Sequence, residues 1–258
     1  MDISDLKNWA ANHRYAILFF LGLLLAWESA AAFHWINIRL LPAPSAIFGA
    51  FLESWRNGEL KRDFLVSIWR AGIGLGAGFL LGAVLGILTG RSPAWHRLIS
   101  PLFNTLRAFP PVALLPVYIT LLGIGNFSKI VSIACACIFP VWVNTHLGAS
   151  RVPEEYLQSA RLMTDSRTRI FFRVIMPSAL PWILGGLRQA LAMSFIMLYV
   201  SELAGASAGL GYQISSSHLA YRMDKMFAAL FVLGALAAGS DTLISFLTKR
   251  LFPWLRFN

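Results

Sequence analysis

The chain has 258 residues, of which 57% are hydrophobic and only 13% are charged, and its formal net charge is +10. This composition carries more apolar surface than one soluble core normally buries, so it indicates a membrane protein. No basic run with interleaved aromatics supports a nucleic-acid partner. There is no G-x-x-x-x-G-K-[ST] loop, zinc-type cluster or nucleophile-elbow serine, so we expect neither ATP hydrolysis nor covalent catalysis by this chain, and no bound metal or cofactor.

Six apolar runs are long enough to cross a bilayer, because a spanning helix needs about 20 mostly apolar residues. They cover roughly 15–36, 66–89, 102–124, 128–148, 177–200 and 226–248. We therefore predict an all-α membrane protein with six transmembrane helices, built as one transmembrane domain over residues 1–258. With a cytosolic N-terminus, twelve Lys and Arg residues of the loops lie inside and seven outside, so the positive-inside bias predicts that both termini are cytosolic. The net charge then reflects topology and contact with anionic lipid.

The first loop, residues 37–65, contains Pro42 and Pro44, and Ser45 is a candidate cap for a short helix. Its apolar stripe consists of Ile47, Phe48, Phe51, Leu52 and Trp55. Such a stripe suits an interfacial helix on the outer side, either bracing the bundle or also meeting a substrate-delivering protein.

Five glycines recur every fourth residue in the second span, at Gly74, Gly78, Gly82, Gly86 and Gly90. They share one helix face, and small residues at this spacing let another backbone approach closely in lipid. We expect this face to pack within the bundle or against a second subunit, or to provide a smooth surface for helices that move against each other.

The third span contains Arg107, Phe109, Pro110, Pro111 and Pro116. Each proline removes a backbone donor, so we predict a bent or broken helix, which is tolerated at membrane depth only beside protein or a water-filled cavity. The break either lines a pathway or serves packing. Arg107 lies near the cytosolic end, where we expect it to reach the headgroups rather than attract an anion.

The remaining polar residues of the spans are few. Cys135 and Cys137 are two positions apart on one helix and are expected to be free thiols. Arg188 and Asp241 are candidates for an ion pair between helices. Glu202 precedes a Gly-rich loop, which its carboxylate either holds in place or accompanies at an outer gate. The candidate translocation path comprises Arg107, Phe109, Pro110, Pro111, Ser194, Tyr199 and Glu202.

A charged segment, residues 152–176, separates the fourth and fifth spans. Its pattern predicts an amphipathic helix at about 154–165, a turn at Thr164–Ser166, and a second helix ending at Pro177. This element is too polar to cross the bilayer, so we expect it to lie at the cytosolic face and to receive a soluble partner.

The whole chain resembles the permease subunits of ATP-binding-cassette importers that use a substrate-binding protein, in the branch that handles nitrate, taurine and aliphatic sulfonates. That family's cytosolic loop reads E-A-A, three residues, G, nine residues, I-x-L-P. Here the matching positions are Gln158-Ser159-Ala160, Thr164 and Val174-Ile175-Met176-Pro177, so Gln158 replaces an acid and Thr164 replaces a glycine. Further similarity lies in LPAPSAIF (41–48), RAFPPVALLPV (107–117), GIGNFSKI (123–130) and SELAGASAGLGY (201–212).

The resemblance implies a type I importer permease in the bacterial inner membrane that carries a small solute, such as a sulfonate, taurine, nitrate or bicarbonate. It implies a second permease copy, in a homodimer or a heterodimer, an ATPase subunit that binds ATP and Mg, and a substrate-binding protein outside. The ATPase-coupling residues would be Glu154, Glu155, Gln158, Ser159, Ala160, Arg161 and Thr164.

Two other classes of function remain open on the residues alone. A gradient-driven carrier or passive channel would move solute without an ATPase, and a membrane scaffold would move none with any partner. The core shows neither several acids nor a clear internal repeat, which a gradient-driven carrier would usually have.

Overall fold

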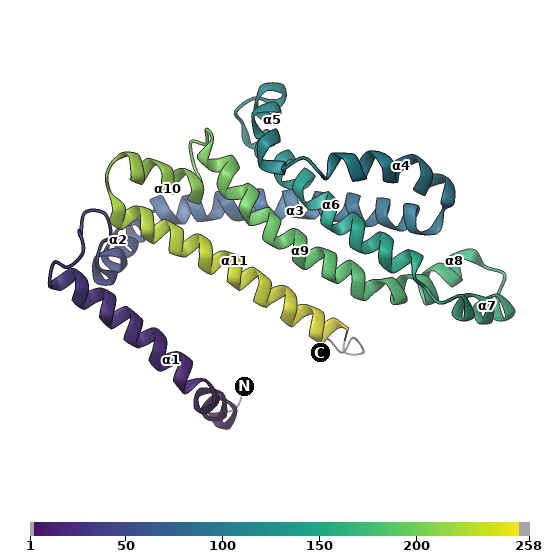
Figure 1. The fold of residues 1–258 in the computed structure, drawn as a ribbon, viewed down its shortest axis with the longest axis horizontal. Helices are drawn as coiled ribbons and strands as arrows, with labels where there is room; N and C mark the ends of the chain where they lie inside the picture. The colour runs from purple at the N-terminus through teal and green to yellow at the C-terminus, as the bar shows by residue number, and fades with distance from the viewer. Residues whose placement is uncertain (1–2, 253–258) are drawn as a thin grey trace. The chain divides into compact units, whose positions relative to one another are not determined.

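The computed structural model describes residues 3–252, with side chains from Arg14 onward, and that part of the chain is helical without a strand (Figure 1). The α-helices are α1 (Ile3–Ala32), α2 (Pro44–Arg56), α3 (Glu59–Arg91), α4 (Pro93–Leu106), α5 (Leu115–Leu122), α6 (Asn126–Ser150), α7 (Glu154–Met163), α8 (Arg167–Ile170), α9 (Met176–Leu203), α10 (Leu210–Leu219) and α11 (Met223–Leu251). A 3-10 turn, η1 (Pro111–Leu114), precedes α5, and a π-helical turn, η2 (Phe171–Ile175), joins α8 to α9.

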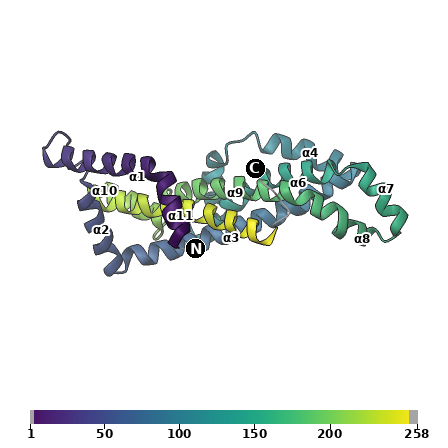
Figure 2. The same ribbon diagram turned by 90° about the horizontal axis from the view of Figure 1, so that it is seen from below.

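The helices form two compact units. Residues 62–212 and 232–252 make the larger unit, and residues 3–61 and 213–231 make the smaller one. Within the larger unit, α7 and α8 lie at one end and the loop at 204–209 lies at the other (Figure 1). The two ends are connected by α9, which packs along α6 (Figure 2).

In the described part of the chain, five helical segments are long and apolar enough to cross a membrane, and a sixth crossing results if α4 and α5 form one broken span. The all-α architecture is therefore confirmed. The third predicted span, 102–124, includes the end of α4, which begins at Pro93, and the helix axis turns by 87° between the segments Pro93–Leu106 and Pro111–Leu122. The predicted break is confirmed: the chain at Pro110 has no backbone donor, and a proline disfavours helical backbone in the residue before it.

The sequence predicts that the second helix of the charged segment ends at Pro177, and this prediction is wrong. The helix continues without interruption from Arg167 to Leu203. The reason is the turn η2, in which the Met176 N–H bonds to the Phe171 carbonyl, five residues back rather than four. A wider turn beside Pro177 accommodates the ring and the missing donor, so the helix passes the proline. The first helix and the turn after it lie where the sequence predicts them.

The glycine face of α3 lies against α6. A Cβ added to any of the five glycines that are four residues apart would come within 2.5–2.7 Å of an α6 atom; these are Gly74, Gly78, Gly82, Gly86 and Gly90. At Gly78 and Gly82 the obstruction includes the backbone carbonyls of Ala134 and Ile138, which cannot move aside as a side-chain tip can. This close backbone approach positions α6, and with it α9, at the centre of the larger unit.

In the smaller unit, α2 forms over the predicted residues, but Ser45 is not its cap. Ala43 occupies the cap position, and Ser45 donates its N–H and hydroxyl to the Glu28 carboxylate of α1, at 3.1 and 2.6 Å. The Glu28 carboxylate thus accepts a backbone N–H of the first turn of α2, which is the capping role that the sequence predicts for the Ser45 side chain. The buried face of α2 is Ile47, Ala50 and Ser54, whereas Phe48 and Trp55 of the predicted stripe remain exposed.

Candidate translocation and coupling sites

The break in the third span opens beside a small polar cavity. Arg107, the residue that follows α4, lines this cavity of about 120 Å³ together with His96, Ser100 and Asn104 of α4. The opposite wall comes from α6 and includes Trp142 and His146. The polar face of α4 therefore points toward α6 rather than toward lipid, which is the arrangement expected where a broken helix borders a solute or water.

A chain of contacts holds the α6 wall of this cavity. The rings of His96 and His146 stack with their centroids 4.9 Å apart, and Ser100 Oγ lies 2.9 Å from His96 Nδ1. Thr89 of α3 contacts both His146 Nδ1 and the Trp142 indole N–H at 3.1 Å. His146 is thus a hydrogen-bonded imidazole. Within the described residues no group of three His, Cys, Asp or Glu side chains that could hold a metal ion occurs.

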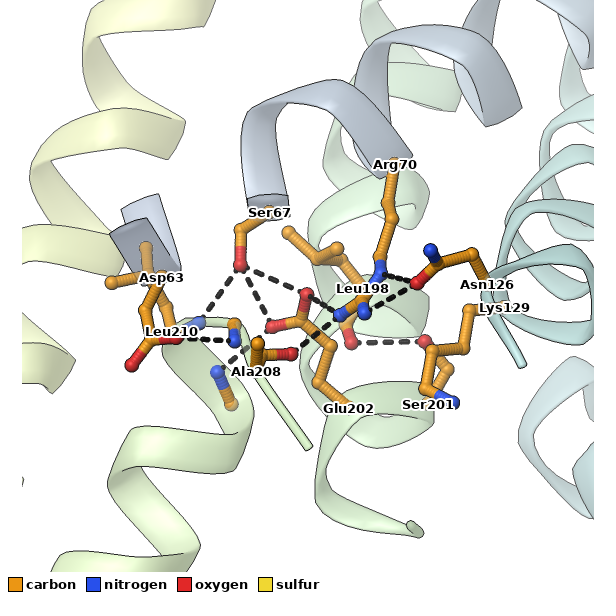
Figure 3. A network of polar contacts seen from close by, with 12 residues as sticks. Asp63, Ser67, Arg70, Asn126, Lys129, Leu198, Ser201, Glu202, Ala208 and Leu210 are labelled. Atoms are coloured by element: carbon orange, nitrogen blue, oxygen red, sulfur yellow. Dashed lines mark hydrogen bonds and ion pairs between the residues drawn. The ribbon is translucent and has the colours of Figure 1, made fainter. Parts of the chain in front are cut away.

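At the opposite end of the larger unit, Glu202 lies at the centre of a buried polar network (Figure 3). Its carboxylate is fully buried and pairs with Arg70 of α3, with 2.8 Å between Arg70 Nη1 and Glu202 Oε1. The same carboxylate accepts the Ser67 hydroxyl and the Gly211 N–H. A carboxylate with an arginine and two further donors is the compensated form in which a charge is found at membrane depth.

The network extends from Glu202 to the loop at 204–209. Arg70 donates to the Ala208 carbonyl at 2.7 Å, and both its Nε and Nη2 donate to Asn126 Oδ1. Asp63 accepts the Gly209 N–H, and Ser67 accepts the Leu210 N–H. The start of α10 is therefore fixed to α3 by side chains that replace its missing helical partners.

Lys129 secures the same loop from α6. Its side chain is 2% exposed, and its Nζ donates to the carbonyls of Ile124, Gly125 and Gly205. Gly209 is required in this loop for two reasons: its φ of +123° suits glycine, and a Cβ there would collide with the Glu202 carboxylate. The geometry shows Glu202 bracing the Gly-rich loop, which is one of the two roles that the sequence leaves open.

The candidate path residues do not form one cluster. Arg107, Phe109 and Pro110 are exposed at the break, whereas Ser194 and Glu202 are fully buried. Ser194 donates its hydroxyl to the Leu191 carbonyl of its own helix, and Tyr199 is half-buried. Sequence reasoning missed Arg70, Asp63 and Ser67, although an arginine inside a predicted span is itself a signal that a buried carboxylate lies nearby.

The predicted pair between Arg188 and Asp241 is confirmed. Arg188 Nε lies 3.5 Å from Asp241 Oδ1, and Arg188 Nη2 donates to Ser245 Oγ at 2.8 Å. Both charged side chains are about half exposed, so this contact links α9 to α11 without burying a charge.

The seven candidate coupling residues all lie on α7 or directly after it. One face is anchored, because Leu157 is 3% exposed and packs with Val152 and Ile175. The other face is open: Leu162 and Met163 are about 90% exposed, and Glu154 and Arg161 form an exposed pair at 3.4 Å. The helix α7 therefore presents uncovered apolar side chains next to charges, a combination typical of a surface that receives a partner.

Comparison with known families places most of the chain in one group. Residues 78–257 match the family described as the binding-protein-dependent transport system inner membrane component. This match begins inside α3 and includes the broken span, α6, the α7–α8 segment and α9.

Individual relatives agree with this match. The chain is 32% identical to an aliphatic sulfonates transport permease protein of Bacillus subtilis, over 90% of this chain and 84% of the relative. It is 30% identical to a nitrate import permease protein of Synechocystis, over 74% and 70%. The fold is similar to a chain of the MetNI methionine ABC transporter in an inward-facing form, with a TM-score of 0.61 and 21% identity over 75% of this chain and 94% of that one.

Proposed function

This chain belongs to the family of binding-protein-dependent transport system inner membrane components, and from that membership we propose that it forms the translocation path of an ATP-driven importer. It is a permease of the ATP-binding-cassette type, a transport subunit rather than an enzyme. A separate subunit would bind ATP and Mg and hydrolyse the nucleotide. The observation that carries this proposal is the family match, which spans both the broken helix and the α7–α8 segment.

The open face of α7 supports docking of the ATPase subunit. Leu162, Met163 and Tyr156 are exposed on a helix whose other face is fixed by Leu157, so a partner can push on α7 without unfolding it. The helix that starts at Arg167 runs on through η2 into α9 without a hinge loop. Movement of α7 and α8 would therefore reach the core of the larger unit directly. Glu154, Glu155, Gln158, Ser159, Ala160, Arg161 and Thr164 are our proposed coupling residues.

For the substrate we propose a small anion, such as a sulfonate or nitrate. Two of the relatives are named for such anions. The cavity at the break is lined by Arg107 with hydroxyl, amide and imidazole groups, and no acid occurs among its lining residues in the described part of the chain. The position of Arg107 in this cavity favours contact with an anion over the headgroup contact that its place in the sequence favours. Arginine with neutral donors is a suitable lining for sulfonate or nitrate oxygens. We place Arg107, Phe109, Pro110 and Pro111 on the path, with Ser194, Tyr199 and Glu202 supporting it.

We further propose two permease copies, a substrate-binding protein on the outer side, and an inner-membrane location with both termini in the cytosol. The excess of Lys and Arg in the loops on the proposed inner side supports this orientation. The exposed apolar faces of the spans leave room for a second copy or for lipid.

The test is uptake into proteoliposomes that contain the permease with its ATPase subunit and binding protein. We expect uptake only with ATP, and a drop of tenfold or more for Leu162→Asp with an unchanged melting temperature, because Leu162 is 90% exposed. Leu251→Asp, a change at an exposed leucine of α11, serves as the matched control and should transport normally. Uptake by the permease alone, indifferent to nucleotide, would show a carrier or channel instead.

A further inference from the structure

The larger unit contains a second, larger cavity, at the end where α7 and α8 lie. It has a volume of about 820 Å³, within the range of small-molecule binding sites. Its walls come from the end of α3, the start of α4, α7, and the segment from α8 to η2. The candidate path residues contribute none of these walls, and of the proposed coupling residues only Arg161 does.

Three arginines from three different elements meet in this cavity: Arg91 of α3, Arg161 of α7 and Arg167 of α8. No acidic side chain is among its lining residues in the described part of the chain. Arg161 forms an exposed pair with Glu154, whereas Arg91 and Arg167 have no ion pair within the described residues. The one hydrogen bond of the Arg91 side chain to a described residue is long, 3.4 Å, and goes to the Ala149 carbonyl. The cavity thus carries uncompensated positive charge.

Apart from Ser92 and Thr168, the other lining residues are apolar or aromatic, with Leu88, Trp95 and Phe171 among them. Arg91 also continues an exposed apolar row along α3, formed by Leu81, Val84 and Leu88, which are 54%, 56% and 36% exposed. These residues are spaced by three and four positions, so they share one face, and that face differs from the glycine face against α6. An arginine at the end of an exposed apolar helix face is the arrangement that a phospholipid matches, with its phosphate at the charge and its acyl chains on the row.

We infer that this cavity binds the headgroup of an anionic phospholipid of the cytosolic leaflet. Arg91 and Arg167 contact the phosphate, Arg161 adds charge at the rim, and Trp95 lies at headgroup depth. The inference rests on the proposed function only for the side of the membrane, because the proposed function places α7 and α8 at the cytosolic face. Because Arg161 belongs both to this cavity and to α7, bound lipid would hold α7 against the end of α3.

The test is lipid titration of the purified permease–ATPase complex, followed by native mass spectrometry. The two lipids are phosphatidylglycerol and phosphatidylcholine with identical acyl chains. We expect preferential binding of phosphatidylglycerol, and roughly 30-fold weaker binding by the double variant Arg91→Gln, Arg167→Gln, since a basic residue near the surface contributes about 1 kcal/mol. The matched control is Arg169→Gln with Arg173→Gln, which removes the same charge from exposed arginines of the same segment that do not line the cavity.

A second measurement does not depend on mass spectrometry. Brominated phosphatidylglycerol should quench the fluorescence assigned to Trp95, taken as the difference from Trp95→Phe, and the double variant should lose that quenching.

Equal loss of lipid by the control pair would overturn the inference. Displacement of the lipid by millimolar inorganic phosphate would also overturn it, because that result would indicate a free-anion site. Loss of the ATPase subunit by the double variant with unchanged lipid binding would show a protein contact instead. If uptake proves independent of nucleotide while lipid binding persists, only the proposed function fails.

Discussion

At the residue scale, the pair of Arg70 and Glu202 is the contact whose loss should cost most. Both side chains are at most 5% exposed, and removing one charge would leave the other buried without compensation. We predict that Glu202→Gln destabilises the purified permease by about 3–5 kcal/mol, measured as a lower melting temperature in detergent. It should also release the 204–209 loop, seen as faster proteolysis there, because the Gly211 N–H and Ser67 hydroxyl lose a charged acceptor.

The control for this prediction is Asp241→Asn. Asp241 also pairs with an arginine, but both partners are about half exposed, so solvent screening leaves this pair worth about 1 kcal/mol or less. Equal shifts in melting temperature for the two variants would contradict the assignment of Glu202 as a buried brace. The double variant Arg70→Gln, Glu202→Gln should recover part of the loss, since no charge then stays unpaired.

At the element scale, the packing of α3 on α6 depends on glycines whose absent side chains cannot be replaced. We predict that Gly78→Ala destabilises the protein by about 1–3 kcal/mol, because the new methyl group would lie 2.6 Å from the Ala134 carbonyl oxygen and would push the two helices apart. The melting temperature and uptake in proteoliposomes should both fall.

Gly76→Ala is the matched control on the same helix. A Cβ at Gly76 meets nothing within 4 Å, and alanine is the better helix former by about 1 kcal/mol, so this variant should be neutral or more stable. A comparable loss for both variants would mean that the glycines matter for flexibility of α3 rather than for its contact with α6.

The elements also show what a sequence can and cannot predict here. The spans, the break at Pro110 and the helix α7 follow from apolar run length, proline chemistry and helical spacing, which are local properties. The partner of Glu202 is not local: Arg70 lies 132 positions away, and only the folded chain brings them together. The prediction for Ser45 failed because a carboxylate from α1, 17 positions away, accepts its donors. The prediction for Pro177 failed for a local reason, because a π-helical turn carries the helix past the proline.

At the scale of the whole molecule, transport depends on which side of the membrane each end of the larger unit faces. The proposed orientation places α7 and α8 in the cytosol, where an ATPase can reach them, and α10 outside, where a binding protein can. This orientation rests on the unequal distribution of Lys and Arg between the loops.

Cysteine labelling in intact cells tests that orientation. In a background with Cys135→Ala and Cys137→Ala, we predict that Leu219→Cys reacts with a membrane-impermeant maleimide added outside, because Leu219 is 75% exposed in the predicted outer segment. Asp165→Cys, in the exposed turn after α7, should react only after the membrane is permeabilised. The opposite labelling pattern would put α7 outside the cell, beyond the reach of any ATPase, and nucleotide-driven movement could then not enter the chain through α7 and α8.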